Sequence, residues 1–466
     1  MCPVRVRRSS QIPPSAHVRK GRWDPVPVGA KRGTPMKNLP LLSDNAIHGT
    51  AHDHFGFVSH ARVLCDALQG TDDLPLTVGI FGPWGMGKSS FMNVCRDLLR
   101  EQNVPTIWFN PWKYDQKDEI WHALIQTVLT EIASDLEKRR AAGEEPWRDR
   151  MAEALATVRR LSQAAAWLLA RRATGPLTGG ILAAEDVDRF QDALAAPNMQ
   201  AYLHVNHFEE DFRDVVRSYT DGGRLVLFVD DLDRCTQDAA ITVLDSLKLF
   251  LGEASCVFVL AMDQQVITEA AARKLGGDLP DLVRGRQYLE KLIHFPYHLP
   301  GVPFEALYRQ LRTEIRPQEL ADSGELWEMI QVAFGANPRR VRRFINGLNL
   351  TAATLALHHP PSLRRLLHAG VLLTLRMLHP AFFLILQEDP GIWNRFDEAE
   401  ARKAGLGGRD EVVDKENPGV RRLMAAVSTH RDGFNFPPPP TADELRLLTE
   451  VLTVTGGLPS APDDQS

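Results

Sequence analysis

The 466-residue chain contains three short, mainly apolar segments, at 76–81, 225–229 and 256–262. Runs of this length are typical of strands that are buried on both faces of a parallel sheet. Between them, and throughout the chain after residue 304, apolar residues recur every three or four positions, which predicts helices. The pattern therefore predicts an α/β protein with a parallel sheet, followed by a helical domain.

Two further strands are expected where the apolar pattern is shorter. Residues 105–114 (PTIWFNPWKY) predict a strand that ends in a turn, and 284–300 predict a helix that leads into a short strand. The aromatic residues of the first segment are typical of a core. Asn110 and Trp112 nevertheless follow the carboxyl end of the strand, which is the ligand side of a parallel sheet.

The basic and acidic residues are distributed unevenly. Residues 1–40 carry nine Lys and Arg residues against Asp24 alone, a net charge of +8, so the rest of the chain carries about −13 of the total of −5. This proline-rich start predicts a disordered basic arm for nucleic acid or anionic lipid, or else an untranslated stretch before a true start at Met36. The acidic remainder argues against a broad nucleic-acid surface.

The sequence contains no sign of secretion or of a disulfide framework. The first 40 residues lack an apolar signal segment, and the five cysteines are scattered without a CxxC pair. The longest apolar stretch of 130–205, Leu161 to Ala170, would rise only about 15 Å as a helix, about half of a bilayer core. We therefore predict a cytoplasmic protein without a transmembrane segment, and peripheral membrane association has no support.

The strongest chemical signal follows the first apolar run, where a glycine-bracketed loop joins a strand to a helix. Its backbone N–H groups and the helix dipole suit a polyphosphate, whereas a glycine-rich turn that only caps a buried helix is the alternative. Lys88 is expected to neutralise the β- and γ-phosphates and Ser89 to bind Mg²⁺. The predicted nucleotide-binding residues are Gly82, Pro83, Trp84, Gly85, Met86, Gly87, Lys88, Ser89 and Ser90.

Acidic residues follow the next apolar run, in the sequence DDLDR. In a P-loop NTPase, a carboxylate at the end of such a strand holds Mg²⁺. We assign this metal role to Asp230 together with Ser89, and we assign Asp231 as the catalytic base that orients the attacking water. An Asp is shorter than the more common Glu at that position, which leaves the rate of hydrolysis open.

Polar residues elsewhere are candidates for sensing the γ-phosphate. Asp263 follows the third apolar run, where it either binds the nucleotide or only caps the next helix. Arg284, Arg286 and Lys291 are candidate arginine-finger cations, or members of solvated ion pairs.

Asn337 to Asn346 (NPRRVRRFIN) predicts a helix with Pro at its first position and four arginines in its first turns. Cations there oppose the helix dipole, which suggests an anionic partner such as the γ-phosphate. Arg339 is our catalytic candidate among them, and Arg340 is its neighbour in the same predicted lid.

Taken in order, GPWGMGKSS, WFNPWKY, LVLFVDDLDRC, YLEKLIHFPYHLP and NPRRVRRFIN resemble the KAP family of P-loop NTPases. The resemblance implies an additional-strand ATPase with a three-layer core, a C-terminal helical lid, ATP and Mg²⁺ as ligands, and a role in bacterial signalling or phage defence. Many members carry transmembrane helices between the two nucleotide motifs, a feature that this polar insert lacks.

The expected domain organisation follows from these assignments. The core is divided into two parts, and an insert separates its two nucleotide motifs. We expect an N-terminal arm at 1–42, core at 43–129, helical insert at 130–205, core at 206–300, helical lid at 301–436, and Pro-rich linker and tail at 437–466.

Three functions are compatible with the sequence. The first is an ATP-hydrolysing conformational switch, acting on an effector protein encoded nearby. The second is a nucleotide-locked scaffold with negligible turnover, and the third is a nucleic-acid remodeller that uses the basic arm. Whether the chain forms a homo-oligomer, in which a neighbour supplies the arginine, stays open.

Overall fold

The computed structural model describes most of the core and of the C-terminal helices. The described residues are 41–46, 53–114, 117–141, 205–250, 255–275, 282–358, 361–388 and 440–455, with the single positions 39, 49, 393 and 423. Nearly all of the predicted N-terminal arm, most of the predicted insert and much of the linker and tail lie outside them. Within the described part, no helix is long and apolar enough to cross a membrane.

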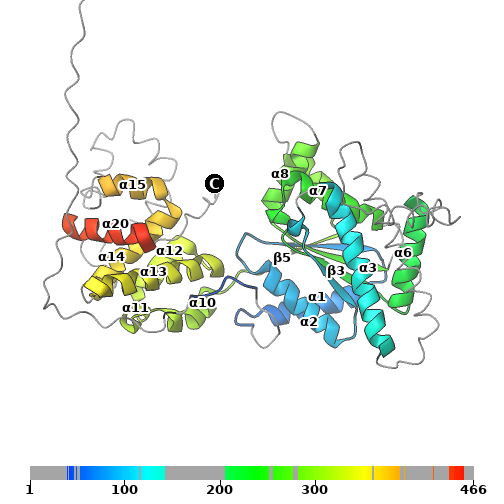
Figure 1. The fold of residues 1–466 in the computed structure, drawn as a ribbon, viewed down its shortest axis with the longest axis horizontal. Helices are drawn as coiled ribbons and strands as arrows, with labels where there is room; N and C mark the ends of the chain where they lie inside the picture. Colours follow the sequence, from blue (N-terminus) through cyan, green and yellow to red (C-terminus); the bar gives the residue numbers. More distant parts are fainter. Residues whose placement is uncertain are drawn as a thin grey trace, which may run out of the picture.

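Five parallel strands form one sheet, which confirms the predicted α/β class (Figure 1). Their order across the sheet is β2-β3-β4-β1-β5, so β4 lies between the strand before the phosphate loop and the strand before the acidic residues. The strands are β1 (Leu76–Phe81), β2 (Thr106–Phe109), β3 (Leu225–Val229), β4 (Cys256–Met262) and β5 (Phe295–His298).

Helices cover both faces of the sheet and complete three layers. Val226 and Phe228 of β3 face the side that carries α1 and α2, while Leu225, Leu227 and Val229 face the other side. Both faces of β3 are therefore buried, as its uninterrupted apolar run predicts. The first side carries α1 (Phe57–Gly70) and α2 (Lys88–Glu101); the second carries α3 (Lys117–Ala141), α6 (Val205–Tyr219), α7 (Gln237–Phe250), α8 (Gln264–Lys274) and α9 (Leu282–Glu290).

Helix α3 runs without a break past residue 130, where the sequence placed the start of the insert. Ile132 and Leu136 are buried with the core residues of α7 and β3. The apolar spacing that packs this helix against the sheet thus continues for nearly two turns beyond the expected boundary.

The chain after β5 is helical in its described part. Its apolar core is continuous with the layer of α1 and α2, and it contains Phe344 of α13 and Leu372 of α14. The helices are α10 (Phe304–Leu311), α11 (Gln318–Ala321), α12 (Gly324–Phe334), α13 (Pro338–His358), α14 (Leu363–Leu378), α15 (Pro380–Glu388) and α20 (Ala442–Thr455). Short 3₁₀ turns are η2 (Pro111–Lys113), η5 (Leu232–Arg234) and η6 (Arg312–Glu314). The N-terminal end of α13 is the part of this domain that approaches the phosphate loop.

Candidate functional site

The loop after β1 has the backbone of a phosphate cradle. Gly85 and Gly87 have φ values of 87° and 97°, a left-handed region in which glycine alone is unstrained. Helix α2 begins directly after them at Lys88, and the Phe91 N–H donates to the Gly87 carbonyl at 2.9 Å. The N–H groups of the first helical turn therefore point out of the helix toward the loop, with the positive end of the helix dipole behind them.

Lys88 lies buried at the centre of this loop. Its Nζ donates to the Gly82 carbonyl at 2.8 Å and forms an ion pair with Asp233 Oδ2 at 2.9 Å. Both side chains are less than a tenth exposed. A polyphosphate entering the loop would compete with Asp233 for the ammonium group.

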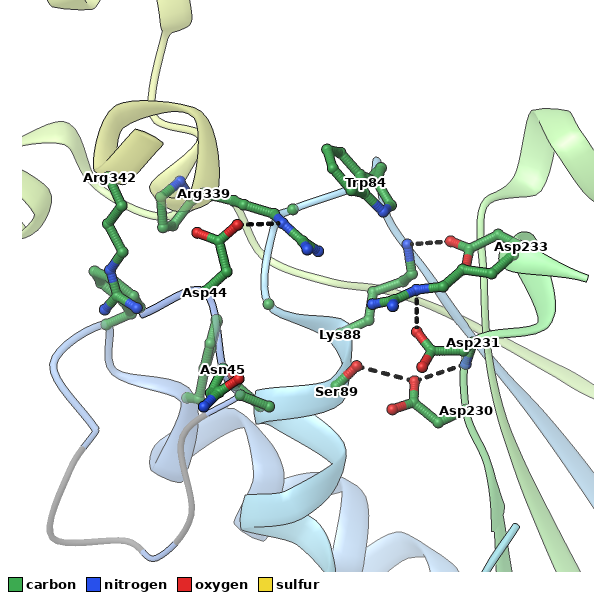
Figure 2. A pocket seen from close by; sticks show the side chains of 18 residues that line it. Asp44, Asn45, Trp84, Lys88, Ser89, Asp230, Asp231, Asp233, Arg339 and Arg342 are labelled. Carbon is green, nitrogen blue, oxygen red and sulfur yellow. Dashed lines mark hydrogen bonds and ion pairs between the residues drawn. The ribbon is translucent and has the colours of Figure 1, made fainter. Parts of the chain in front are cut away.

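Ser89 and Asp230 meet at the floor of the site, as Figure 2 shows. The Ser89 hydroxyl donates to Asp230 Oδ1 at 3.0 Å, and the same oxygen accepts the Asp231 N–H at 2.9 Å. Burial, and then the neighbouring Asp231, raise the pKa of Asp230 to about 6. This buried carboxylate is electrostatically under-compensated and would gain from a bound cation.

Asp231 has a strained backbone and two engaged carboxylate oxygens. Its φ is 60°, which is unusual for a residue with a side chain. Oδ2 accepts a hydrogen bond from Asn110 Nδ2 at 2.9 Å, and Oδ1 pairs with Arg234 Nε at 2.7 Å. The two contacts join the end of β2 to the turn η5 and fix the position of the carboxylate.

The start of α13 contacts the apex of the phosphate loop. Asn337 Nδ2 donates to the Trp84 carbonyl at 3.0 Å, and the Arg339 guanidinium lies 4.1 Å from the centre of the Trp84 ring. A Cβ at Gly85 would come within 2.9 Å of Arg339 Cβ, so a side chain there would collide with α13. The loop and the helical domain are thus in close contact at this position.

The sequence reasoning missed the anion that the arginines of α13 contact. Asp44 Oδ2 pairs with Arg339 Nε at 3.2 Å and with Arg343 Nε at 2.8 Å. Burial lowers the pKa of Arg339, and Asp44 opposes that shift. Four arginines at the start of a helix oppose the helix dipole, and this unfavourable placement did predict an anionic partner. No local pattern, however, identifies Asp44, 295 positions from Arg339, as that partner.

Asp233 and Asn337 were also missed as site residues. Asp233 belongs to the same DDLDR run as the two assigned carboxylates, and its place three residues after Asp230 was a usable signal. Asn337 begins the arginine-rich segment that was assigned to the lid. Its contact with Trp84 depends on how the two domains pack, which no local pattern encodes.

Together these residues enclose a cavity of about 330 Å³. Its walls come from the phosphate loop, the end of β3, the start of α13 and residues 44–46, with Phe55 and Phe57 on one side. Of the predicted residues, the cavity brings together the following set: Trp84, Gly85, Gly87, Lys88, Ser89, Ser90, Asp230, Asp231 and Arg339.

The structure places the other predicted residues apart from that cavity. Gly82, Pro83 and Asp263 line a neighbouring cavity with Arg286, and Asp263 Oδ1 accepts the Gln265 N–H at 3.0 Å as the cap of α8. Met86 occupies the loop between Gly85 and Gly87, with its N–H bonded to the Pro83 carbonyl. The role of Asp263 toward a nucleotide stays a prediction.

Comparison with known proteins identifies the family. The model of the KAP family P-loop domain matches residues 57–355, well over half of the chain. The chain belongs to the KAP family. It is a nucleotide-binding P-loop NTPase by family and fold, and the predicted resemblance is confirmed.

Two curated relatives are similar over different lengths of this KAP protein. The phage T7 exclusion protein of Escherichia coli K12 is 24% identical over 346 residues, 66% of this chain and 42% of the relative. Rat kinase D-interacting substrate of 220 kDa is 30% identical over 77 residues, 16% of this chain and 4% of the relative. The KAP chain therefore spans less than half the length of each relative.

A solved structure also shows some likeness to the KAP chain. The Aeropyrum pernix ORC2 protein, solved as ADPNP–ADP complexes, covers 89% of each chain at 14% identity with a TM-score of 0.33. We draw no functional argument from a likeness at this level.

Proposed function

We propose that this KAP protein binds ATP with Mg²⁺ in the 330 Å³ cavity, hydrolyses it, and passes the state of the nucleotide to its helical domain. The observation that carries this proposal is the meeting of Ser89 and Asp230 beneath the phosphate loop, 3.0 Å apart and 141 residues apart in sequence. A hydroxyl and a buried carboxylate held together at a helix N-terminus suit a metal-bound polyphosphate.

Lys88 and the loop amides would hold the phosphates. The ammonium group, now paired with Asp233, would exchange that carboxylate for the β- and γ-phosphate oxygens. Phosphates carry more charge than one carboxylate, so the exchange is favourable once the nucleotide has entered.

The donors present fit Mg²⁺. Ser89 and Asp230 supply two oxygens, and burial disfavours the charged form of Asp230 in the absence of a cation. Mg²⁺ is normally held by one or two protein oxygens together with substrate phosphates and water, so a larger protein cage is not needed. Bound there, the ion would neutralise charge on the β- and γ-phosphates.

Asp231 is positioned to orient the attacking water. It follows Asp230 at the cavity wall, its backbone is strained, and its carboxylate is held by Asn110 and Arg234. Strain of this kind is common at functional sites.

The contact of α13 with Trp84 and Gly85 supports a conformational switch. A phosphate in the loop would change the surroundings of Asn337 and Arg339, and α13 would carry that change into the helical lid at 301–436. The name of the phage T7 exclusion protein suggests a setting in bacterial defence, in which an effector protein would respond to this lid.

The first test is Lys88→Ala, measured by calorimetric titration with Mg-ATP and by single-turnover hydrolysis. We expect ATP affinity to fall by about 100-fold or more, because the ammonium group that would pair with the phosphates is lost. The protein should stay folded but melt at a lower temperature without nucleotide, because the buried carboxylate of Asp233 loses its partner. Unchanged affinity would contradict the site.

The engaged oxygens of Asp231 favour a second candidate, a scaffold that holds ATP without turnover. Each carboxylate oxygen already accepts one contact, from Asn110 or from Arg234, so a water would have to share an oxygen with one of them until that contact opens. Asp231→Asn separates the candidates. If it lowers a measurable rate, the protein is an ATPase; if both proteins show the same near-zero rate while ATP raises the melting temperature, the scaffold is correct.

A further inference from the structure

Arg234 has no role in the function derived so far, yet it lines the nucleotide cavity. It lies in the turn η5, three residues after Asp231, and its side chain is about one-third exposed. Its Nε contacts Asp231 Oδ1 at 2.7 Å, and its guanidinium lies 5.6 Å from the centre of the Trp112 ring.

The arginines that the sequence favoured are less well placed. Arg339 is paired with Asp44 and lies over Trp84, and Arg286 lines the neighbouring cavity. Arg234 by contrast touches the carboxylate proposed to orient water. A cation at that position contacts the proposed base and lines the cavity in which the polyphosphate would bind.

Charge favours movement of this guanidinium when ATP enters. Without nucleotide, Arg234 neutralises Asp231. A triphosphate brings several negative charges into the same cavity, and its terminal oxygens accept the two-pronged contact of a guanidinium better than a single carboxylate oxygen does. The arginine, about one-third exposed, has room to move, whereas Asn110 continues to hold Asp231 Oδ2.

We propose that Arg234 is a further catalytic residue, which moves from Asp231 to the γ-phosphate of ATP in the same chain. The move stabilises negative charge on the transferring phosphoryl group and frees Asp231 Oδ1 for water. As the water oxygen bonds to the γ-phosphorus, Asp231 accepts a water proton and the bond to the β–γ bridging oxygen breaks. Its electron pair stays on ADP, and inorganic phosphate is the second product.

This inference rests on the proposed ATPase function. It makes the release of Asp231 from Arg234 depend on the γ-phosphate. ADP lacks the group that attracts Arg234, so the ion pair with Asp231 would persist with ADP bound. The base would be released only when a triphosphate is present.

The test compares Arg234→Ala and Arg234→Lys with the matched control Arg309→Ala. Arg309 is an exposed arginine of α10 that pairs with Glu305 at 3.6 Å, far from the phosphate loop in sequence. Each variant is assayed for kcat and KM with Mg-ATP, for ATP and ADP affinity by calorimetry, and for binding of ADP with aluminium fluoride, which mimics the transferring phosphoryl group.

For Arg234→Ala we expect kcat to fall by about 100-fold or more while ADP affinity stays within about threefold, and the aluminium fluoride complex to be lost. Arg234→Lys keeps the pair with Asp231 and the fold, and it should recover only about tenfold of the lost rate because it lacks the guanidinium fork. Arg309→Ala should behave as the wild type.

Several outcomes would overturn the assignment. An unchanged or raised kcat in Arg234→Ala would show that the arginine at most restrains Asp231. Loss of ADP affinity in parallel with ATP affinity would show a structural role. If the wild type has no turnover, the affinities decide instead. A ratio of ATP affinity to ADP affinity that is the same in the wild type and in Arg234→Ala would show that Arg234 does not contact the γ-phosphate. Failure of the proposed function itself would be seen in a different variant. If Lys88→Ala binds Mg-ATP as tightly as the wild type, the nucleotide site is wrong, whatever the Arg234 variants do.

Discussion

Asp230 is an acidic residue whose charged form the fold disfavours. Burial and the nearby Asp231 raise its pKa to about 6 from a usual value near 3.8. The folded protein therefore holds this proton more tightly than the unfolded chain does. The stabilisation from this group is complete below pH 3.8 and is lost as the pH rises through 6.

Because ionised Asp230 destabilises the fold at neutral pH, the variant Asp230→Asn can be predicted to differ from the wild type in the absence of Mg²⁺ and nucleotide. At pH 7.5 the variant should be more stable than the wild type by about 1–3 kcal/mol of unfolding free energy, because the uncompensated charge is gone. The advantage should shrink as the pH falls from about 7 to about 4. Denaturant unfolding in the presence of a chelator measures it.

Asp443→Asn serves as the control, since that carboxylate is almost fully exposed at the start of α20. It should show no such pH-dependent difference. A variant at position 230 that is less stable at every pH would contradict the electrostatic interpretation. With Mg-ATP present, Asp230→Asn should lose its advantage, because the cation then compensates the wild-type carboxylate.

At the scale of elements, Asn337 connects α13 to the phosphate loop. Its Oδ1 caps α13 by accepting the Arg340 N–H at 3.2 Å, while its Nδ2 reaches the Trp84 carbonyl. Ser362 caps α14 in the same way, accepting the Arg365 N–H at 3.3 Å. The two caps differ in that Asn337 also contacts the loop.

We expect Asn337→Ala and Ser362→Ala each to cost about 1 kcal/mol of stability, as lost helix caps do. Asn337→Ala alone should also lower Mg-ATP affinity and reduce the change that ATP causes in amide exchange of α13. Thermal unfolding, titration and hydrogen–deuterium exchange measure the three effects. Equal nucleotide affinities in the two variants would disprove the proposed coupling through Asn337.

Elements with a strong local pattern were predictable from the sequence. The apolar runs gave β1, β3 and β4, and Pro338 marked the first residue of α13. The boundary of the insert was not predictable in this way, because the helical spacing of α3 continues smoothly past residue 130. Periodicity identifies a helix but does not say which part of it packs on the sheet.

At the scale of the whole molecule, residues 41–46 join the start of the chain to the helical domain. Asn346 of α13 accepts the Leu42 N–H at 2.8 Å and donates to the Leu42 carbonyl at 2.9 Å. These contacts place Asp44 beside Arg339 at the cavity. A segment distant in sequence thus forms one wall of the candidate nucleotide cavity.

One turn later in α13, Asn349 provides a matched comparison. It makes the same pair of contacts with a local loop, accepting the Arg316 N–H at 2.8 Å and donating to the Glu314 carbonyl at 2.7 Å. We expect Asn346→Ala and Asn349→Ala to lose similar stability, about 1–2 kcal/mol each, since both leave partly buried backbone groups without these partners.

Asn346→Ala alone should increase amide exchange at 41–46 and weaken ATP binding. Exchange mass spectrometry and calorimetry distinguish the two variants. Slow exchange of 41–46 in Asn346→Ala would mean that Asp44 and its arginine partners are sufficient to hold the segment.

The sequence predicted the chemistry of the site better than its enclosure. Lys88, Ser89, Asp230 and Asp231 belong to local motifs, and the structure brings all four to one cavity, while their roles stay predictions. Asp44, by contrast, is a single acidic residue in a polar stretch, and its pairing with α13 depends on how two domains pack. Ion pairs between residues far apart in the sequence produce no periodic pattern, so they cannot be predicted from the sequence in this way.

The stacking of Arg339 and Arg343 on Trp84, at 4.1 Å and 5.1 Å from the ring centre, has a practical consequence. The emission of an indole depends on the charges beside it, so this residue is a natural optical reporter of events at the phosphate loop. The difference spectrum between the wild type and Trp84→Phe isolates its signal from the other tryptophans. Nucleotide arrival in this NTPase can then be followed in real time without attaching a dye.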